Sequence, residues 1–221
     1  MIRFGFVLFI AALRSLAARA PTSAFAGSPA GAEIAGVEPG EGDAAPAPGA
    51  DPAKPEPPAL TRQQKLDDLF ARLAASSDVA ETNGLVVAID RLLLDSGSDT
   101  GDLLMARAMA AMGSKNLEVS LALLDKIVVL QPGWAEAWNK RATVRYLLDD
   151  DQGSMADIAH VLALEPRHFG ALSGMAMILE RDGFRDDALR AYRRALEIAP
   201  QLTSVRNAVD RLTTAVDGQS L

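Results

Sequence analysis

The chain has 221 residues, a formal net charge of −7 and no cysteine. That length allows one or two domains. The acidic balance argues against nucleic acid as a partner, because phosphate binding needs clustered lysine and arginine. Without cysteine the chain has no disulfide, thiol nucleophile or cysteine metal site, although this leaves the compartment open.

The first 26 residues have the layout of a secretory signal peptide. Arg3 gives a basic start, an apolar run covers residues 4–13, and Ala24–Ala26 forms an A-x-A cleavage pattern. As a helix the apolar run would span about 15 Å, half of the roughly 30 Å of a bilayer core. We therefore expect a cleaved signal and an exported, periplasmic protein. The alternative is a membrane anchor through residues 4–20, and only then would the chain contact a membrane.

Residues 27–59 are rich in glycine, proline, alanine and acidic side chains. This composition cannot bury enough apolar surface to offset the entropy of ordering. We therefore expect a disordered linker that serves as a solvated spacer. A docking tail for a proline-reading or basic partner is the alternative.

Residues 60–100 predict a helical hairpin. Two apolar stripes with helical spacing support it, and they contain Leu66, Leu69, Phe70 and Leu73, then Leu85, Val86, Ile89, Leu92 and Leu93. The segment lacks the repeat pattern that follows it. Because a terminal repeat has one face toward water, we expect this hairpin to cap the N-terminal end of a helical stack.

The segment 101–202 contains an internal repeat. Pro132, Pro166 and Pro200 lie 34 residues apart, and a fixed period of this length is typical of stacked repeats. Seven further columns align on the same period: Leu104, Trp138, Leu172; Ala108, Ala142, Ala176; Ser120, Ser154, Ala188; Leu124, Ile158, Tyr192; Ile127, Val161, Ala195; Val128, Leu162, Leu196; and Leu130, Leu164, Ile198.

Each repeat predicts two antiparallel helices. In residues 135–168, Trp138, Ala142 and Tyr146 recur at four-residue spacing, as one helical face requires. The polar run 149–153 ends that helix, a second periodic run follows, and the next proline cannot continue it. We expect the alanine column to lie where the two helices cross. The remaining apolar faces need neighbouring repeats to cover them.

This pattern resembles the tetratricopeptide repeat (TPR) family, in the form of a small exported bacterial protein. The resemblance covers three repeats, 101–134, 135–168 and 169–202. It implies an all-α, right-handed α-solenoid of antiparallel helix hairpins with about nine helices, closed by a capping helix and tail over 203–221.

The sequence departs from the family where Arg107 and Arg141 replace the usual leucine. These arginines either bond helix-end carbonyls between hairpins or extend a stem along the surface with a solvated head.

No constellation for catalysis, a metal ion or a cofactor is expected. His160 and His168 are the only histidines, and no hydrolase, protease or phosphate-binding motif occurs. Asp149–Asp151 raises a calcium alternative but lacks the other ligands of a calcium loop. A turn and cap for the helix that contains Ser154 is favoured.

The family resemblance implies that the first helix of each repeat lines a concave, peptide-binding groove. The matching residues are Met105, Met109, Met112, Glu136, Asn139, Thr143, Tyr146, Ser173, Met177 and Glu180. Asn139 stands where family members bond a peptide backbone. The basic clamp that some members use is absent, with Met105, Met109, Gly170 and Gly174 in its places and only Lys140 nearby.

The residues therefore predict an apolar protein or peptide partner rather than an acidic C-terminal tail. Methionine side chains adapt to irregular shapes, although Met109 and Met177 also fit ordinary core positions. The leading hypothesis is an exported, non-catalytic interaction module for a peptide or helical segment of a cell-envelope protein. The alternatives are a structural protein that self-associates through its end faces, a membrane-anchored assembly factor, and an enzyme of unseen type.

Overall fold

The computed structural model describes residues 60–217, with side chains through residue 214. The expected signal segment, the linker and the last residues of the tail lie outside this range. Over 60–217 the chain forms nine helices and no strand, which confirms the all-helical fold. The helices are α2 (Arg62–Ala75), α3 (Val79–Leu94), α4 (Asp99–Gly113), α5 (Leu117–Leu130), α6 (Ala135–Leu147), α7 (Asp151–Leu164), α8 (Phe169–Arg181), α9 (Arg185–Ile198) and α10 (Thr203–Asp217).

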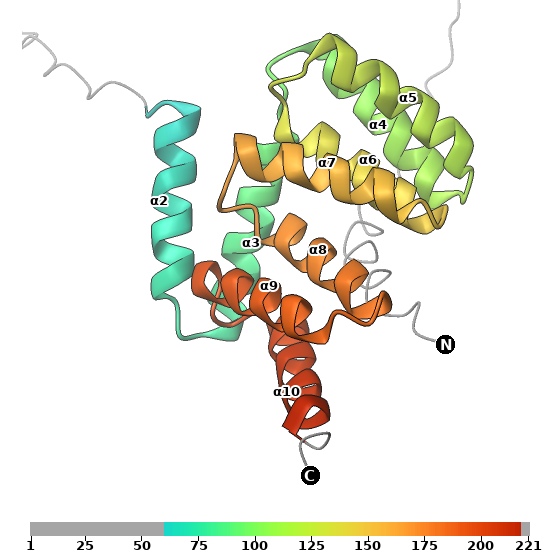
Figure 1. The fold of residues 1–221 in the computed structure, drawn as a ribbon. Helices are drawn as coiled ribbons and strands as arrows, with labels where there is room; N and C mark the ends of the chain where they lie inside the picture. Colours follow the sequence, from blue (N-terminus) through green and yellow to red (C-terminus); the bar gives the residue numbers. More distant parts are fainter. Residues whose placement is uncertain (1–59, 218–221) are drawn as a thin grey trace, which may run out of the picture. The chain divides into compact units, whose positions relative to one another are not determined.

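The three sequence repeats form three helix pairs, α4–α5, α6–α7 and α8–α9 (Figure 1). Neighbouring pairs touch through α5 and α6, and through α7 and α8. Each pair thus covers an apolar face of the next, as a stack of helical repeats requires.

The alanine column lies where the helices of a pair cross, as predicted. Ala108, Ala142 and Ala176 are buried, because only a small side chain lets the two backbones approach. In the first two repeats a serine hydroxyl of the second helix donates to the alanine carbonyl at 2.9 Å: Ser120 to Ala108, and Ser154 to Ala142. The small-residue columns therefore serve both packing and hydrogen bonding.

Each first helix ends in the same kind of turn. Lys115, Asp149 and Gly183, one repeat apart, have φ values of 63°, 62° and 87°. The next residue's N–H bonds a carbonyl five residues back, which closes the helix end; the pairs are Asn116–Ala111, Asp150–Arg145 and Phe184–Leu179. The Asp150 side chain then accepts from the N–H of Gly153 and caps α7. The acidic run is thus a turn and cap, as favoured.

The hairpin α2–α3 forms as predicted but does not stack on the first repeat. Its contacts with the repeats are mainly α3 with α6 and α2 with α9. In Figure 1, α3 passes behind α7, on the side of the first helices. Leu66, Phe70, Leu85 and Ile89 share a core with residues of α8, α9 and α10. A shared core decides this placement, because it buries both apolar stripes of the hairpin at once.

The last helix, α10, packs against α9 and is amphipathic. Val205 and Leu212 are buried, whereas Arg206, Asp210 and Arg211 are exposed. The helix therefore covers the apolar face that the third repeat would otherwise expose.

The contacts of Arg141 contradict both expectations, since it neither bonds helix-end carbonyls nor extends into solvent. Its Nε and Nη2 donate to the two carboxylate oxygens of Asp157 at 2.9 and 2.7 Å, and Nη1 donates to Asp125 on α5 at 2.9 Å. The Asp157 side chain is only 1 % exposed and also pairs with Arg145 at 3.1 Å. The reason is that a buried carboxylate needs charged partners, so Arg141 turns inward. Arg107, in the same column, is exposed.

Candidate protein-binding groove

The predicted groove residues fall into columns on α4, α6 and α8. Because the repeats share one register, residues 34 apart occupy equivalent places on successive first helices. The columns are Met105, Asn139 and Ser173; Met109, Thr143 and Met177; and Met112, Tyr146 and Glu180. With Glu136 near the start of α6, these are the positions expected to line the groove that the family resemblance implies.

The polar groove residues are already engaged within the protein. The Asn139 amide donates to both Glu136 oxygens, at 3.3 and 3.2 Å. The hydroxyls of Thr143 and Ser173 donate to carbonyls one turn back on their own helices. Glu180 pairs with Arg211 of α10. A partner that bonds these groups must therefore displace an internal bond.

Four charged or titratable groups meet beside α3. Glu136 is 4 % exposed and contacts the Lys140 ammonium at 2.6 Å and the His168 Nε2 at 2.9 Å. Burial alone would raise the pKa of Glu136, but Lys140 and His168 outweigh it and lower the pKa to about 2. On α3, burial and the charge of Glu136 raise the pKa of Asp90 to about 6, although Lys140 and His168 oppose them.

His168 has a structural role. Its Nδ1 accepts from the N–H of Ala171 and caps α8, while Nε2 faces Glu136. His160 is exposed and stacks on Trp138, with ring centroids 4.2 Å apart. Neither histidine belongs to a metal-binding cluster within the described residues.

The apolar groove residues differ in exposure. Met105 is buried at 2 % and belongs to the core between α4 and its neighbours. Met109, Met112, Met177 and Tyr146 are partly exposed while packing on those cores. Arg181 lies over the Tyr146 ring at 4.3 Å. The accessible apolar surface therefore comes from the middle and C-terminal turns of the first helices.

The hairpin α2–α3 borders this surface at the N-terminal ends of the first helices. The Trp134 indole N–H, at the start of α6, donates to the Leu93 carbonyl at 2.7 Å. Arg167 bonds Asp67 at 2.8 Å and lies over the Phe70 ring. Phe70 also meets Phe169 edge-on. Sequence reasoning missed this border, since no repeat column signals it.

None of the nine described helices is long and apolar enough to cross a membrane. The proposed anchor segment lies outside the described residues.

The stack defines the class of protein as a helical repeat protein. No family model matches the chain. The chain is 40 % identical over 156 residues to a TPR repeat-containing protein of Rhizobium etli, across 71 % of this chain and 76 % of that protein. The chain therefore belongs to the TPR repeat-containing proteins.

Solved structures show the same fold at low identity. The first TPR domain of Spaghetti (RPAP3), bound to the HSP90 peptide SRMEEVD, is 16 % identical with a TM-score of 0.51, covering 53 % of this chain and 93 % of that domain. The Sgt2 TPR domain from Aspergillus fumigatus gives 14 % and 0.51, covering 56 % and 83 %. MamA gives 18 % and 0.51, covering 61 % and 78 %.

Proposed function

We propose that the protein is an exported, non-catalytic module that binds a peptide or helical segment of a cell-envelope protein. The binding surface is the side of the stack formed by α4, α6 and α8. One observation carries this proposal: partly exposed methionines and a tyrosine recur in the groove columns of successive first helices. Membership of the TPR repeat proteins and the peptide bound to the Spaghetti domain support it.

The chemistry of the surface favours an apolar partner. Met109, Met112 and Met177 are flexible and polarizable, and Tyr146 offers a large ring with a polar tip, a frequent hot-spot residue. The polar neighbours are satisfied internally. Binding energy therefore comes chiefly from apolar burial, and the interaction should depend weakly on salt.

Export rests on the sequence of the first 26 residues. In an extracytoplasmic compartment the absence of cysteine makes the fold independent of disulfide formation. The partner is then a protein, or a segment of one, on the outer side of the inner membrane.

The test replaces Met112 and Met177 together with glutamine, since Met105 is core and a change there would disturb the fold. Tagged protein is used to capture proteins from the extracytoplasmic fraction, and mass spectrometry identifies them. A partner held by the unaltered chain should be lost from the double variant, with a loss of affinity of about tenfold or more. Far-UV circular dichroism checks that both chains are folded.

Met155→Gln is the matched control, because Met155 is equally a partly exposed methionine but lies on α7, a second helix. It should retain the partner. A partner that moderate salt releases and that ignores the Met112 and Met177 changes would contradict the proposal.

A further inference from the structure

The third repeat lacks the buried ion network of the second. In the second repeat, Arg141 bridges Asp125 of α5 and Asp157 of α7. The residues 34 positions further on are all apolar: Met175, Ala159 and Ala191. The space between α5 and α7 is thus closed by charged side chains, whereas the equivalent space between α7 and α9 is lined by apolar ones.

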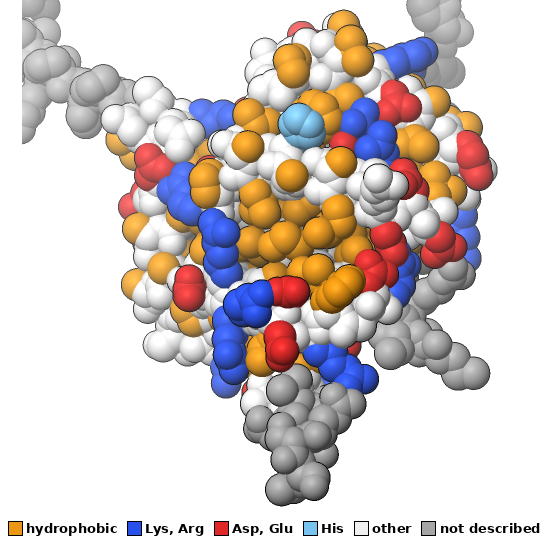
Figure 2. Space-filling view, in the orientation of Figure 1, with side chains coloured by type: hydrophobic (Ala, Val, Ile, Leu, Met, Phe, Trp, Pro, Cys, Tyr) orange, Lys and Arg blue, Asp and Glu red, His pale blue; other side chains and the backbone are white. Residues whose placement is uncertain are grey.

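Figure 2 shows this apolar space as a hollow over α8, between α7 and α9, which we call the furrow. Leu162 of α7 and Met175 of α8 are partly exposed. Each packs against the core between α6, α7 and α8 and against the core that α8 and α9 share with the hairpin α2–α3 and α10. This furrow lies on the face of the second helices, away from the groove columns of α4, α6 and α8. Its floor is α8, whose 13 residues correspond to about 20 Å.

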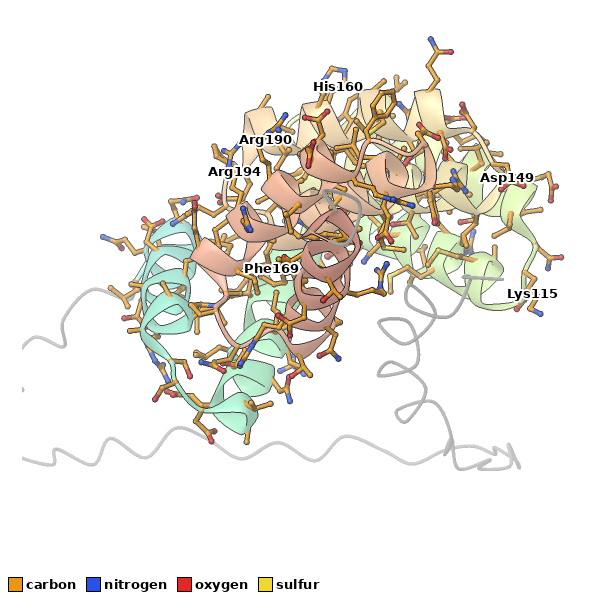
Figure 3. The ribbon with its side chains drawn as sticks, turned by 60° about the horizontal axis from the view of Figure 1, so that its bottom comes forward. Lys115, Asp149, His160, Phe169, Arg190 and Arg194 are labelled. Atoms are coloured by element: carbon orange, nitrogen blue, oxygen red, sulfur yellow. The ribbon has the colours of Figure 1, made fainter. Side chains whose placement is uncertain are left out.

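The α9 side of the furrow carries exposed arginines. Arg190 near the middle of α9 and Arg194 one turn later lie on the same side of the molecule as His160 (Figure 3). Arg190 pairs with Asp187, but no ion pair engages Arg194 among the described residues. Where α8 ends and α9 begins, exposed Asp182 and Asp186 lie beside exposed Arg181 and Arg185, so that end carries charges of both signs. An exposed arginine cluster is notable in a chain of net charge −7.

We propose that this furrow is a second docking site, which takes one amphipathic helix of another protein. The apolar edge of that helix lies on Leu162 and Met175, and its acidic end lies at Arg190 and Arg194. A helix suits the site because ridges of side chains pack into the space between two helices. The exposed arginines fix its direction, because they favour its acidic end over its other end.

A second copy of the chain does not supply the same fit through this face. Two hollows facing each other leave a void, and a void forfeits the contacts that stabilise an interface. With the groove on the first helices, the furrow makes the protein a bridge between two partners.

The test selects from a phage-displayed library of random peptides of about 16 residues, long enough for a helix over the length of α8. Selected peptides should be amphipathic with Asp or Glu near one end. Met175→Arg should weaken their binding by about tenfold or more, because a charged side chain then fills the furrow. Arg107 in the same column is exposed, so the introduced side chain should extend to solvent. Far-UV circular dichroism checks that the variant is folded.

Charge reversal provides the second measurement. Arg190→Glu with Arg194→Glu should weaken binding by about tenfold and reduce its salt dependence. Lys126→Glu is the matched control, because Lys126 is exposed in the column of Arg194 but two repeats earlier. It should leave the affinity unchanged, as should the Met112 and Met177 changes in the groove.

Three outcomes would overturn the proposal. One is that no peptide is enriched. Another is that the enriched peptides bind the Met175→Arg variant as well as the unaltered chain. The third is a dimer in sedimentation that Met175→Arg dissociates, which would assign the furrow to self-association. If the Met112 and Met177 changes alone abolish binding of a partner, that result concerns the proposed function of the groove and not the furrow.

Discussion

At the scale of single residues, the second repeat depends on the Asp157 carboxylate. It is 1 % exposed and accepts from Arg141 and Arg145. A buried charge that loses its partner is strongly destabilising, and so is removal of one member of such a network. The third repeat shows that the fold accepts an apolar version of the same site, with Met175 and Ala191.

We predict that Asp157→Ala lowers the free energy of unfolding by about 3–5 kcal/mol, because it leaves Arg141 buried without its main partner. The double change Arg141→Met with Asp157→Ala, which copies the third repeat, should recover much of this loss. Urea denaturation of both variants provides the measurement. A double variant as unstable as Asp157→Ala alone would show that the arginine is not the source of the loss.

At the scale of helices, the docking of α3 brings the Asp90 carboxylate close to charged groups of the repeats. Asp90 faces Glu136 and Lys140 of α6 and His168 at the start of α8. Its pKa is raised to about 6 in the folded state from an ordinary 3.8, chiefly by burial. The folded chain therefore binds this proton more tightly than the unfolded chain, so the contribution of Asp90 to stability falls as pH rises from about 4 through 6.

We predict that Asp90→Asn, which mimics the protonated acid, stabilises the protein at pH 7 and changes little near pH 4. Denaturation midpoints at several pH values between 4 and 7 provide the measurement. Glu136 acts in the opposite direction, because its pKa is lowered to about 2 in the folded state. Its contribution to stability changes only at pH values below about 4.5, outside most of the measured range. Equal pH profiles for the variant and the unaltered chain would show that Asp90 is not the titrating group.

At the scale of the whole molecule, the repeats form a scaffold whose two proposed surfaces lie on different faces. The groove uses α4, α6 and α8, whereas the furrow is bounded by α7 and α9, with α8 as its floor. Occupation of one surface therefore leaves the other free. If the protein is exported, both surfaces are accessible to proteins of the cell envelope.

We predict that the exported protein begins at Gly27, because the A-x-A pattern ends at Ala26. Edman sequencing of protein from the extracytoplasmic fraction should read Gly-Ser-Pro. Intact Met1 in the membrane pellet would favour the anchor instead.

The sequence by itself determined the helices, the pairing and the family. These follow from local causes, because periodic apolar residues, the prolines and the small-residue columns act within one repeat and its neighbour. The left-handed turn at the end of each first helix was harder to predict. Of the three residues in that column only Gly183 suggests it, whereas Lys115 and Asp149 do not.

Only the tertiary structure decided which residues are available for binding. Met105 matches a groove position by register, yet it is buried because its neighbours fill the space around it. The hairpin α2–α3 packs on α6 and α9 rather than on α4, and Arg141 turns inward to Asp157. These outcomes depend on contacts between segments far apart in sequence, such as Asp67 with Arg167. A repeat pattern does not encode them, because it records only what each unit shares with the next.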